Sequence, residues 1–138
     1  MSLFKVFDIA GSGMSAQNTR LNTTASNLAN AETVSGTEEG AYRARQPVFA
    51  AVMKSLYSSD PESVGVQVRG VVESDTPVQM RYAPDNPMAN EEGYVYQSNV
   101  NMVDQMVNMI SASRSYQNNV EVVNTSKQLL LATLRMGE

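Results

Sequence analysis

Two apolar stripes with helical spacing, one at each end of the chain, constrain the fold most. The N-terminal stripe alternates steps of four and three residues through Leu3, Phe7, Ala10, Met14, Gln17, Leu21, Thr24 and Leu28. Its four members Phe7, Met14, Leu21 and Leu28 fall on one seven-residue repeat, which is typical of a coiled-coil seam. The spacing predicts a helix over residues 3–28 that is roughly 40 Å long.

The C-terminal stripe has the same alternation and is longer. It runs through Met102, Met106, Met109, Ser113, Tyr116, Val120, Val123, Lys127, Leu130 and Leu134. A helix over residues 100–136 would span roughly 55 Å, which is long for a chain of 138 residues. We expect the two helices to pair as an antiparallel coiled coil in which each stripe completes the seam of the other.

The middle of the chain has a different character, with all five prolines, most of the glycines and short alternating runs. Valines alternate over residues 64–72, and Val78, Met80 and Tyr82 alternate after a turn at residues 74–77, which together predict a β-hairpin. Residues 42–49 and 94–96 are further strand candidates, and residues 36–40 and 58–63 are predicted loops. The predicted fold is therefore α+β, with helical regions 1–31 and 100–138 flanking a β and loop region, 32–99.

The polar faces of the predicted helices carry little charge. Between Ser12 and Asn30, eleven of nineteen residues are Ser, Thr, Asn or Gln, which are mediocre helix formers. We expect this segment to be weakly ordered until another surface covers it. Neutral hydrogen-bonding side chains such as Asn27 and Asn30 can be buried against neighbours without desolvating a formal charge, so they suit a crowded assembly.

Catalytic and metal-binding chemistry has little support in this composition. The chain has no cysteine and no histidine, which removes thiolate ligands, the commonest metal ligand and the commonest general base. Residues 11–13 (GSG) lack the lysine of a phosphate loop, and residues 85–93 break the calcium-loop pattern with a proline at its third position. We therefore predict no enzymatic activity, no cofactor and no metal, and interpret residues 85–93 as an Asx-rich turn.

Charge and hydropathy exclude several partners. The net charge is −4, and residues 37–99 hold nine acidic and five basic residues, which argues against a nucleic-acid site. We expect no cleavable secretory signal, because residues 1–7 form no apolar run of sufficient length, and no membrane-spanning segment.

Two alternative functions are considered. A small enzyme or ligand-binding domain would need convergent polar groups on a compact β core, and the sequence offers no such cluster. A membrane-surface helix would need a lysine- and arginine-rich polar face, whereas Arg20 stands nearly alone. A structural assembly subunit is the favoured interpretation.

Several motifs resemble the family of bacterial flagellar rod and hook proteins. The N-terminal ones are residues 12–17 (SGMSAQ), Arg20-Leu21 and residues 25–33 (ASNLANAET). Residues 86–95, 99–101 and 106–117, with Glu121, are similar to the proximal-rod members of that family.

The resemblance implies a structural subunit of the proximal rod, a hollow drive shaft that crosses the periplasm and transmits motor torque to the hook and filament. It implies partners that are copies of this chain and rod subunits of the FlgB, FlgF and FlgG type. It also implies export through the flagellar type III apparatus without cleavage. On this basis we expect the assembly interface to use Leu3, Phe7, Met14, Leu21, Leu28, Asn27, Asn30, Met102, Met106, Met109, Tyr116, Val120, Val123, Leu130 and Leu134.

Overall fold

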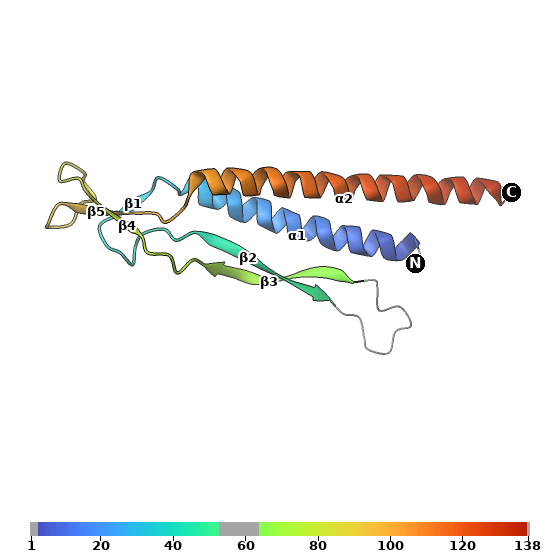
Figure 1. Ribbon diagram of the computed structural model, residues 1–138, viewed down its shortest axis with the longest axis horizontal. Coiled ribbons are helices and arrows are strands. Elements are labelled where there is room, and N and C mark those ends of the chain that lie inside the picture. The colour runs from blue at the N-terminus through green and yellow to red at the C-terminus, as the bar shows by residue number, and fades with distance from the viewer. Residues whose placement is uncertain (1–2, 53–63, 138) are drawn as a thin grey trace.

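Two long helices lie side by side with a small β region at one end and along one side. The computed structural model describes residues 3–52 and 64–137. Helix α1 (Leu3–Ala29) runs away from the end that holds both termini, and helix α2 (Met102–Met136) returns toward it (Figure 1). The predicted α+β fold, with two long terminal helices packed together around an inserted β region, is confirmed.

The register of the helix pair is set by two contacts. The Asn27 side chain lies opposite that of Gln105, with Nδ2 and Oε1 3.0 Å apart. The second contact joins Gly13 of α1 to Asn119 of α2. Each of these residues is fourteen positions from the first contact, Gly13 before Asn27 and Asn119 after Gln105. Helix α2 begins at a clear cap, because the Asn101 side chain accepts hydrogen bonds from the backbone N–H groups of Val103 and Asp104.

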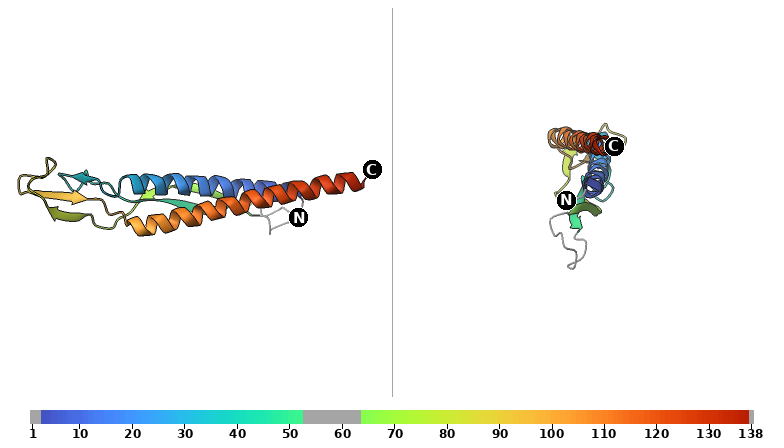
Figure 2. Two further views of the ribbon diagram at one scale, coloured as in Figure 1. Left: turned by 90° about the horizontal axis from the view of Figure 1, so that it is seen from above. Right: turned by 90° about the vertical axis from the view of Figure 1, so that its right-hand side faces the viewer.

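A two-stranded sheet packs along α1 on a side that α2 does not cover. Strands β2 (Arg45–Val52) and β3 (Gly65–Glu73) are antiparallel, with Arg45 opposite Glu73 and an irregularity between Val48 and Phe49. The Ser12 hydroxyl joins helix to sheet, since it accepts a hydrogen bond from Val66 N–H (3.1 Å) and donates one to the carbonyl of Ile9 (2.8 Å). Helix α1 is thus flanked by α2 and by this sheet (Figures 1 and 2).

A three-stranded antiparallel sheet forms the end of the molecule farthest from the termini. Strand β5 (Tyr94–Gln97) lies between β1 (Val34–Ser35) and β4 (Gln79–Tyr82), and its Val95 is fully buried. The turn before β5 is Asx-rich as predicted: the side-chain oxygen Oδ1 of Asn90 accepts hydrogen bonds from the N–H groups of Glu92 and Tyr94. This sheet and its turns are called the tip.

The predicted hairpin between residues 64–72 and 78–82 is wrong. Strand β3 pairs instead with β2, and β4 pairs with β5. Residues 74–77 therefore connect the two sheets and do not form a hairpin turn. The Asn99 side-chain amide holds this connection, because it donates to the carbonyls of Thr76 (2.7 Å) and Ser74 (3.4 Å). Residues 36–40 form a turn as predicted, and the loop predicted at 58–63 lies outside the described residues.

The interior is thin for a chain of this size. Its buried apolar residues within 3–52 and 64–137 are five alanines and Val95. The accessible surface is 9730 Å², whereas a compact monomer of this mass would expose about 7,000 Å². An extended subunit with so much uncovered surface is suited to being covered by other chains.

Candidate assembly interface

The seam between α1 and α2 is built from small and polar side chains. On α2 the buried residues Gln105, Ala112 and Ser126, with Asn119, fall on one seven-residue repeat. Gly13 and Asn27 face them from α1. Small side chains let the helices approach closely, and the amides satisfy one another, so the seam needs no large apolar residue.

The prediction that the two apolar stripes complete one seam inside the chain is met only in part: the stripe members Ala10 and Thr24 are buried, and the large apolar members are not. Met106 and Leu134 are 51% and 63% exposed, Tyr116 is 36% exposed, and Phe7, Met14, Leu21 and Leu28 are half-buried. The stripes stand beside the seam: Met14 follows Gly13 on α1, and Val120 follows Asn119 on α2. One residue is about 100° around a helix, so Met14 and Val120 are turned away from the facing helix, whereas stripe members four residues after a seam residue, such as Val123, are turned by only about 40°.

Both stripes lie on the same side of the helix pair. Met14 and Val120 each follow a seam residue by one position, so each is rotated by the same angle about its own helix axis. Because the helices are antiparallel, these two rotations turn the side chains toward the same side of the pair. The sheet β2–β3 contacts α1 on a different side, at Ser12. The large apolar residues of the two stripes thus form one partly covered apolar surface, which is called the stripe face. Its half-buried members are Phe7, Met14, Leu21, Leu28, Met109, Val120, Val123 and Leu130.

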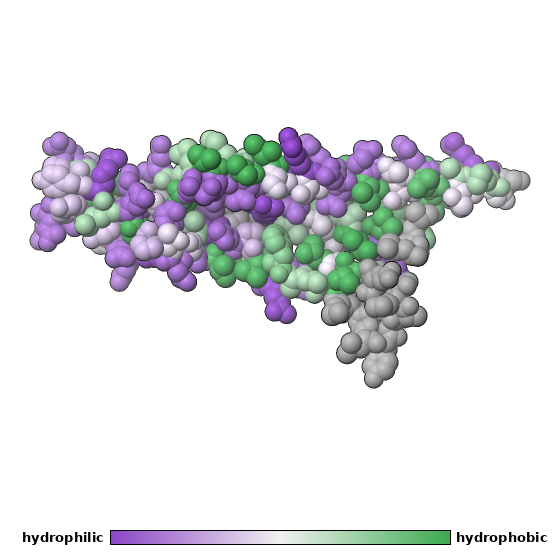
Figure 3. Space-filling model, viewed as in Figure 1, coloured by the Kyte–Doolittle hydropathy of each residue, from purple (hydrophilic) through white to green (hydrophobic). Residues whose placement is uncertain are grey.

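A second apolar surface covers the first two turns of α2 on the side opposite the seam. Figure 3 shows it as a cluster of hydrophobic residues above the start of α2. It consists of Met102, Val103, Met106, Val107 and Ile110, whose exposed fractions range from 37% to 68%. This surface is called the α2 patch, and its members Val103, Val107 and Ile110 do not belong to the predicted C-terminal stripe. Uncovered apolar clusters of this kind mark contacts with other proteins.

The polar junction at Asn27 joins both helices to the sheet. Its amide nitrogen donates to the Arg45 carbonyl (2.8 Å) and to Gln105 Oε1 (3.0 Å), and its carbonyl oxygen accepts from Arg45 N–H (2.9 Å) and the Tyr42 hydroxyl (3.0 Å). Asn27 is only 1% exposed. Asn27, which the sequence analysis assigned to contacts with neighbouring subunits, is therefore buried within its own chain.

Asn30 is half-buried and donates to the Ser26 carbonyl (2.9 Å). Tyr42, Gln105, Ala112 and Ser126 were missed by the sequence reasoning. The signal for Gln105, Ala112 and Ser126 is their seven-residue spacing, which is not seen when large apolar residues alone are counted.

Within the described residues, nothing indicates metal chemistry or a membrane span. Residues 3–52 and 64–137 contain no group of three or more His, Cys, Asp or Glu side chains placed to hold a metal ion. In the same ranges, neither helix is apolar enough along its length to cross a bilayer. The features that remain are the stripe face, the α2 patch and the exposed C-terminal end of α2.

An elongated helix pair with uncovered apolar faces is the architecture of an assembly subunit, and comparison with known proteins identifies the assembly. The family described as "Flagella basal body rod protein" matches residues 7–36, and the "Flagellar basal body rod FlgEFG protein C-terminal" family matches residues 91–136. These two matches cover α1 and α2, the elements that carry both apolar surfaces.

Similar proteins extend over the whole chain. The flagellar basal-body rod proteins FlgC of Yersinia enterocolitica and Salmonella typhimurium are each 48% identical over 138 residues, covering all of both chains. The FlgC of Borreliella burgdorferi is 33% identical and covers 97% of each chain. The chain belongs to the FlgC family of flagellar basal-body rod proteins, and it is a structural rod subunit of the flagellum.

Proposed function

We propose that this chain polymerises with other rod proteins into the hollow proximal part of the drive shaft, which transmits motor torque to the hook and filament. The observation that carries this proposal is the stripe face, which runs along both helices and which the chain itself covers only in part. A large apolar surface left open along a rod-shaped subunit is best accounted for by burial against neighbouring helices. The subunit is not an enzyme, and it acts through its shape and contacts.

Resistance to twisting follows from that burial. Sliding one helix pair past another would return apolar side chains to water at about 25 cal/mol per Å². A contact that buries several hundred Å² therefore holds its register by many times the thermal energy. Repeated around a tube, such contacts make a stiff shaft.

The interface we propose comprises the stripe face and the α2 patch. Its members are Leu3, Phe7, Met14, Leu21 and Leu28 on α1, and Met102, Val103, Met106, Val107, Met109, Ile110, Tyr116, Val120, Val123, Leu130 and Leu134 on α2. Asn27 supports this surface from inside the chain, and Asn30 flanks the end of α1.

We further propose that the partners are copies of this chain and rod subunits of the FlgB, FlgF and FlgG type. The subunit reaches the periplasm through the flagellar type III export apparatus, without a cleavable signal peptide. Neither nucleic acid nor direct membrane insertion takes part.

Complementation of a strain that lacks this chain tests the proposal. The wild-type chain should restore swimming and a rod that extends beyond the inner-membrane ring in electron micrographs. Leu21→Asp and Met109→Asp should restore neither, because each buries a carboxylate in the apolar contact. Gln117→Asp, at an exposed position of α2, is the matched control and should restore both. A complete rod in the strain without this chain would overturn the proposal.

A further inference from the structure

A polar groove lies between α2 and strand β2, with α1 as its floor. Its volume is about 400 Å³, and it is lined by Arg20 and Thr24 of α1, Gln105 and Asn108 of α2, and residues 45–47 and 49 of β2. Both charged residues of this lining are arginines, and it contains no carboxylate. It is distinct from the stripe face, which lies on another side of the helix pair. The assembly surface described above does not use it.

The positive charge of Arg20 is not balanced inside the chain. Arg20 is half-buried as a residue, and its guanidinium donates a part-buried hydrogen bond to Asn108 Oδ1 (2.8 Å), an uncharged partner. No carboxylate of residues 3–52 or 64–137 forms an ion pair with Arg20. Arg45, in contrast, pairs with Glu73 at 3.2 Å, and Glu73 lies outside the groove. The groove therefore holds one oriented guanidinium without a counter-charge.

A guanidinium held in this way favours a carboxylate ligand. Its planar fork of N–H donors matches the two oxygens of a carboxylate, and partial burial weakens competition from water. The amides of Gln105 and Asn108 would surround the incoming group with further hydrogen-bonding partners. The space is sufficient for one or two side chains and too small for a helix.

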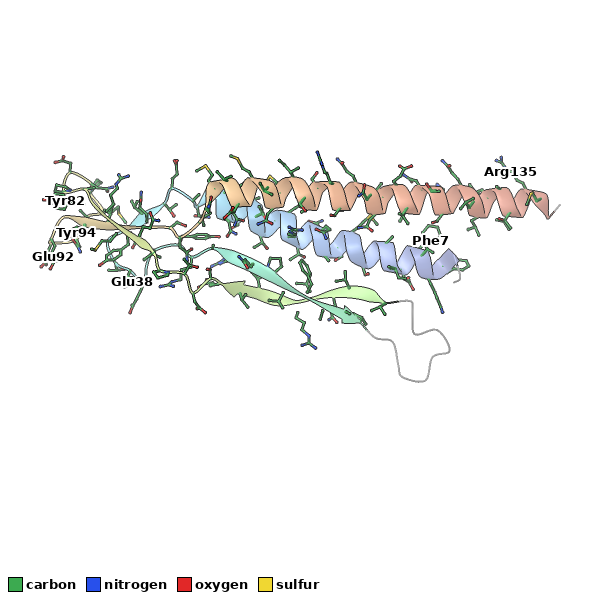
Figure 4. All side chains as sticks on the ribbon, viewed as in Figure 1. Phe7, Glu38, Tyr82, Glu92, Tyr94 and Arg135 are labelled. Atoms are coloured by element: carbon green, nitrogen blue, oxygen red, sulfur yellow. The ribbon has the colours of Figure 1, made fainter. Side chains whose placement is uncertain are left out.

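The chain itself carries suitable carboxylates at its tip. Glu91 and Glu92 are adjacent and exposed in the turn before β5, and Glu92 is labelled at the far end of the molecule in Figure 4. Neither forms an ion pair with any residue in the described parts of the chain. The groove lies between β2 and the first turns of α2, whereas the tip is the end of the molecule farthest from the termini, so this tip does not reach the groove of its own subunit (Figure 1). A second copy, shifted along the long axis toward the termini, would bring its tip beside the groove.

We propose that the groove at Arg20 binds the acidic tip of a second copy, with Glu91 or Glu92 as the carboxylate, and so sets the axial stagger between copies. The inference rests on the proposed assembly function. It adds a polar, directional contact to the apolar ones: the apolar contact resists displacement once it has formed, and the charge pair selects the register in which it forms. One charge pair per subunit fixes the register.

Charge exchange between the two sites tests this contact in the complemented strain. Swimming should fall at least tenfold in the single variant Arg20→Glu. It should fall by the same factor in the double variant that carries Glu91→Lys and Glu92→Lys. The variant with all three changes should regain at least a third of the wild-type rate, because the pair is restored with reversed sign. Arg114→Glu, an exposed reversal on α2, is the control and should swim normally. Arg20→Glu swimming as well as Arg114→Glu, or no rescue in the triple variant, would overturn the inference.

A covalent probe identifies the occupant. Because the chain has no cysteine, Gln46→Cys in the groove wall and Glu92→Cys at the tip introduce the only two thiols. Mild oxidation of isolated basal bodies should then yield a covalent dimer of this chain on a non-reducing gel, and either single variant should yield none. A crosslink to another rod protein, or no crosslink, would overturn the second-copy assignment.

Folding controls keep these outcomes separate. Purified Arg20→Glu should show wild-type circular dichroism. If it does not, Arg20→Gln replaces it, and at least a threefold loss of swimming is expected. Wild-type swimming of Arg20→Gln would count against the inference. Normal assembly of the Arg20 variants beside failure of Leu21→Asp refutes the groove contact alone. Normal assembly of Leu21→Asp as well refutes the proposed function.

Discussion

The side-chain amide of Asn27 pairs with the backbone of Arg45 as a neighbouring β-strand would. It donates to the Arg45 carbonyl at 2.8 Å and accepts from the Arg45 N–H at 2.9 Å. This places the first residue of β2 directly against the end of α1. The second amide hydrogen reaches Gln105, so one side chain sets the mutual positions of α1, α2 and the sheet.

Asn27→Leu should therefore destabilise the subunit by about 2–4 kcal/mol, because it leaves both Arg45 backbone groups and Gln105 without their partner. Gln105→Leu should cost less, about 1–2 kcal/mol, since Asn27 keeps its other three hydrogen bonds. Urea unfolding followed by circular dichroism measures both values.

Asn22→Leu is the matched control, because Asn22 is exposed on the same helix and bonds only to the exposed Asn18 in the described structure. It should change stability by less than about 0.5 kcal/mol. Equal losses for Asn27→Leu and Asn22→Leu would show that the junction does not organise the fold.

The two glycines of α1 should respond differently to the same substitution. A Cβ at Gly11 would meet nothing within 4 Å, so Gly11→Ala should stabilise the chain by about 0.5–1 kcal/mol through helix propensity. A Cβ at Gly13 would lie 3.0 Å from Asn119 Nδ2, which is itself held by the Ser115 carbonyl. Thermal unfolding should therefore show a smaller gain, or a loss, for Gly13→Ala. An equal rise for both variants would contradict the close approach of the helices at Gly13.

The elements of this fold were predictable, and their contacts were not. The stripes predicted helices over residues 3–28 and 100–136, and the structure has them at Leu3–Ala29 and Met102–Met136. Helical periodicity is a local property of the sequence, so it survives whatever the helix packs against. Strand pairing is not local, which is why the hairpin assigned to residues 64–82 proved to be two strands in two different sheets.

The stripes misled about the seam for a physical reason. From sequence alone, the largest apolar residues are assigned to the interior. That assignment is correct for a monomer, which must bury these residues within its own chain. Here Gln105, Ala112 and Ser126 occupy the intrachain seam. Large residues such as Met106 remain at the surface. A subunit that gains its stability on assembly can leave its best apolar surface for neighbours.

The α2 patch should be needed for assembly and dispensable for folding. Val107 is 62% exposed and lies on the side of α2 opposite the seam, so Val107→Asp should change the midpoint of urea unfolding little. The same change should prevent rod formation, because a carboxylate in a buried contact loses its hydration without a partner. Swimming assays and electron microscopy of basal bodies measure the outcome.

Gln117→Asp introduces the same carboxylate at an exposed polar position of α2 and should leave swimming intact. If Val107→Asp also swims normally, the α2 patch is not an interface. If Val107→Asp fails to fold, the residue has an internal role that its exposure does not reveal.

The C-terminal end of α2 should be ordered only after assembly. With Gly13 opposite Asn119, the described part of α1 ends near the level of Leu129, so residues 130–136 continue without a facing helix. Phe7 and Arg135 show this difference in length in Figure 4. Leu134 and Met136 are 63% and 84% exposed. A helical end of about two turns without a facing helix is marginal in water, because helix formation in short segments is weak.

Hydrogen exchange read by mass spectrometry should therefore find the amides of residues 130–136 nearly unprotected in the purified monomer. Those of residues 108–119, which lie against α1, should exchange at least tenfold more slowly, and they serve as the internal reference. In isolated basal bodies both segments should be protected, because neighbours cover Leu134 and its surroundings. Full protection of residues 130–136 in the monomer would show that the end of α2 is stable alone. Fast exchange of residues 130–136 in the basal body would show that Leu134 is not in the interface. The contacts of α2 would then lie only where α1 packs beside it.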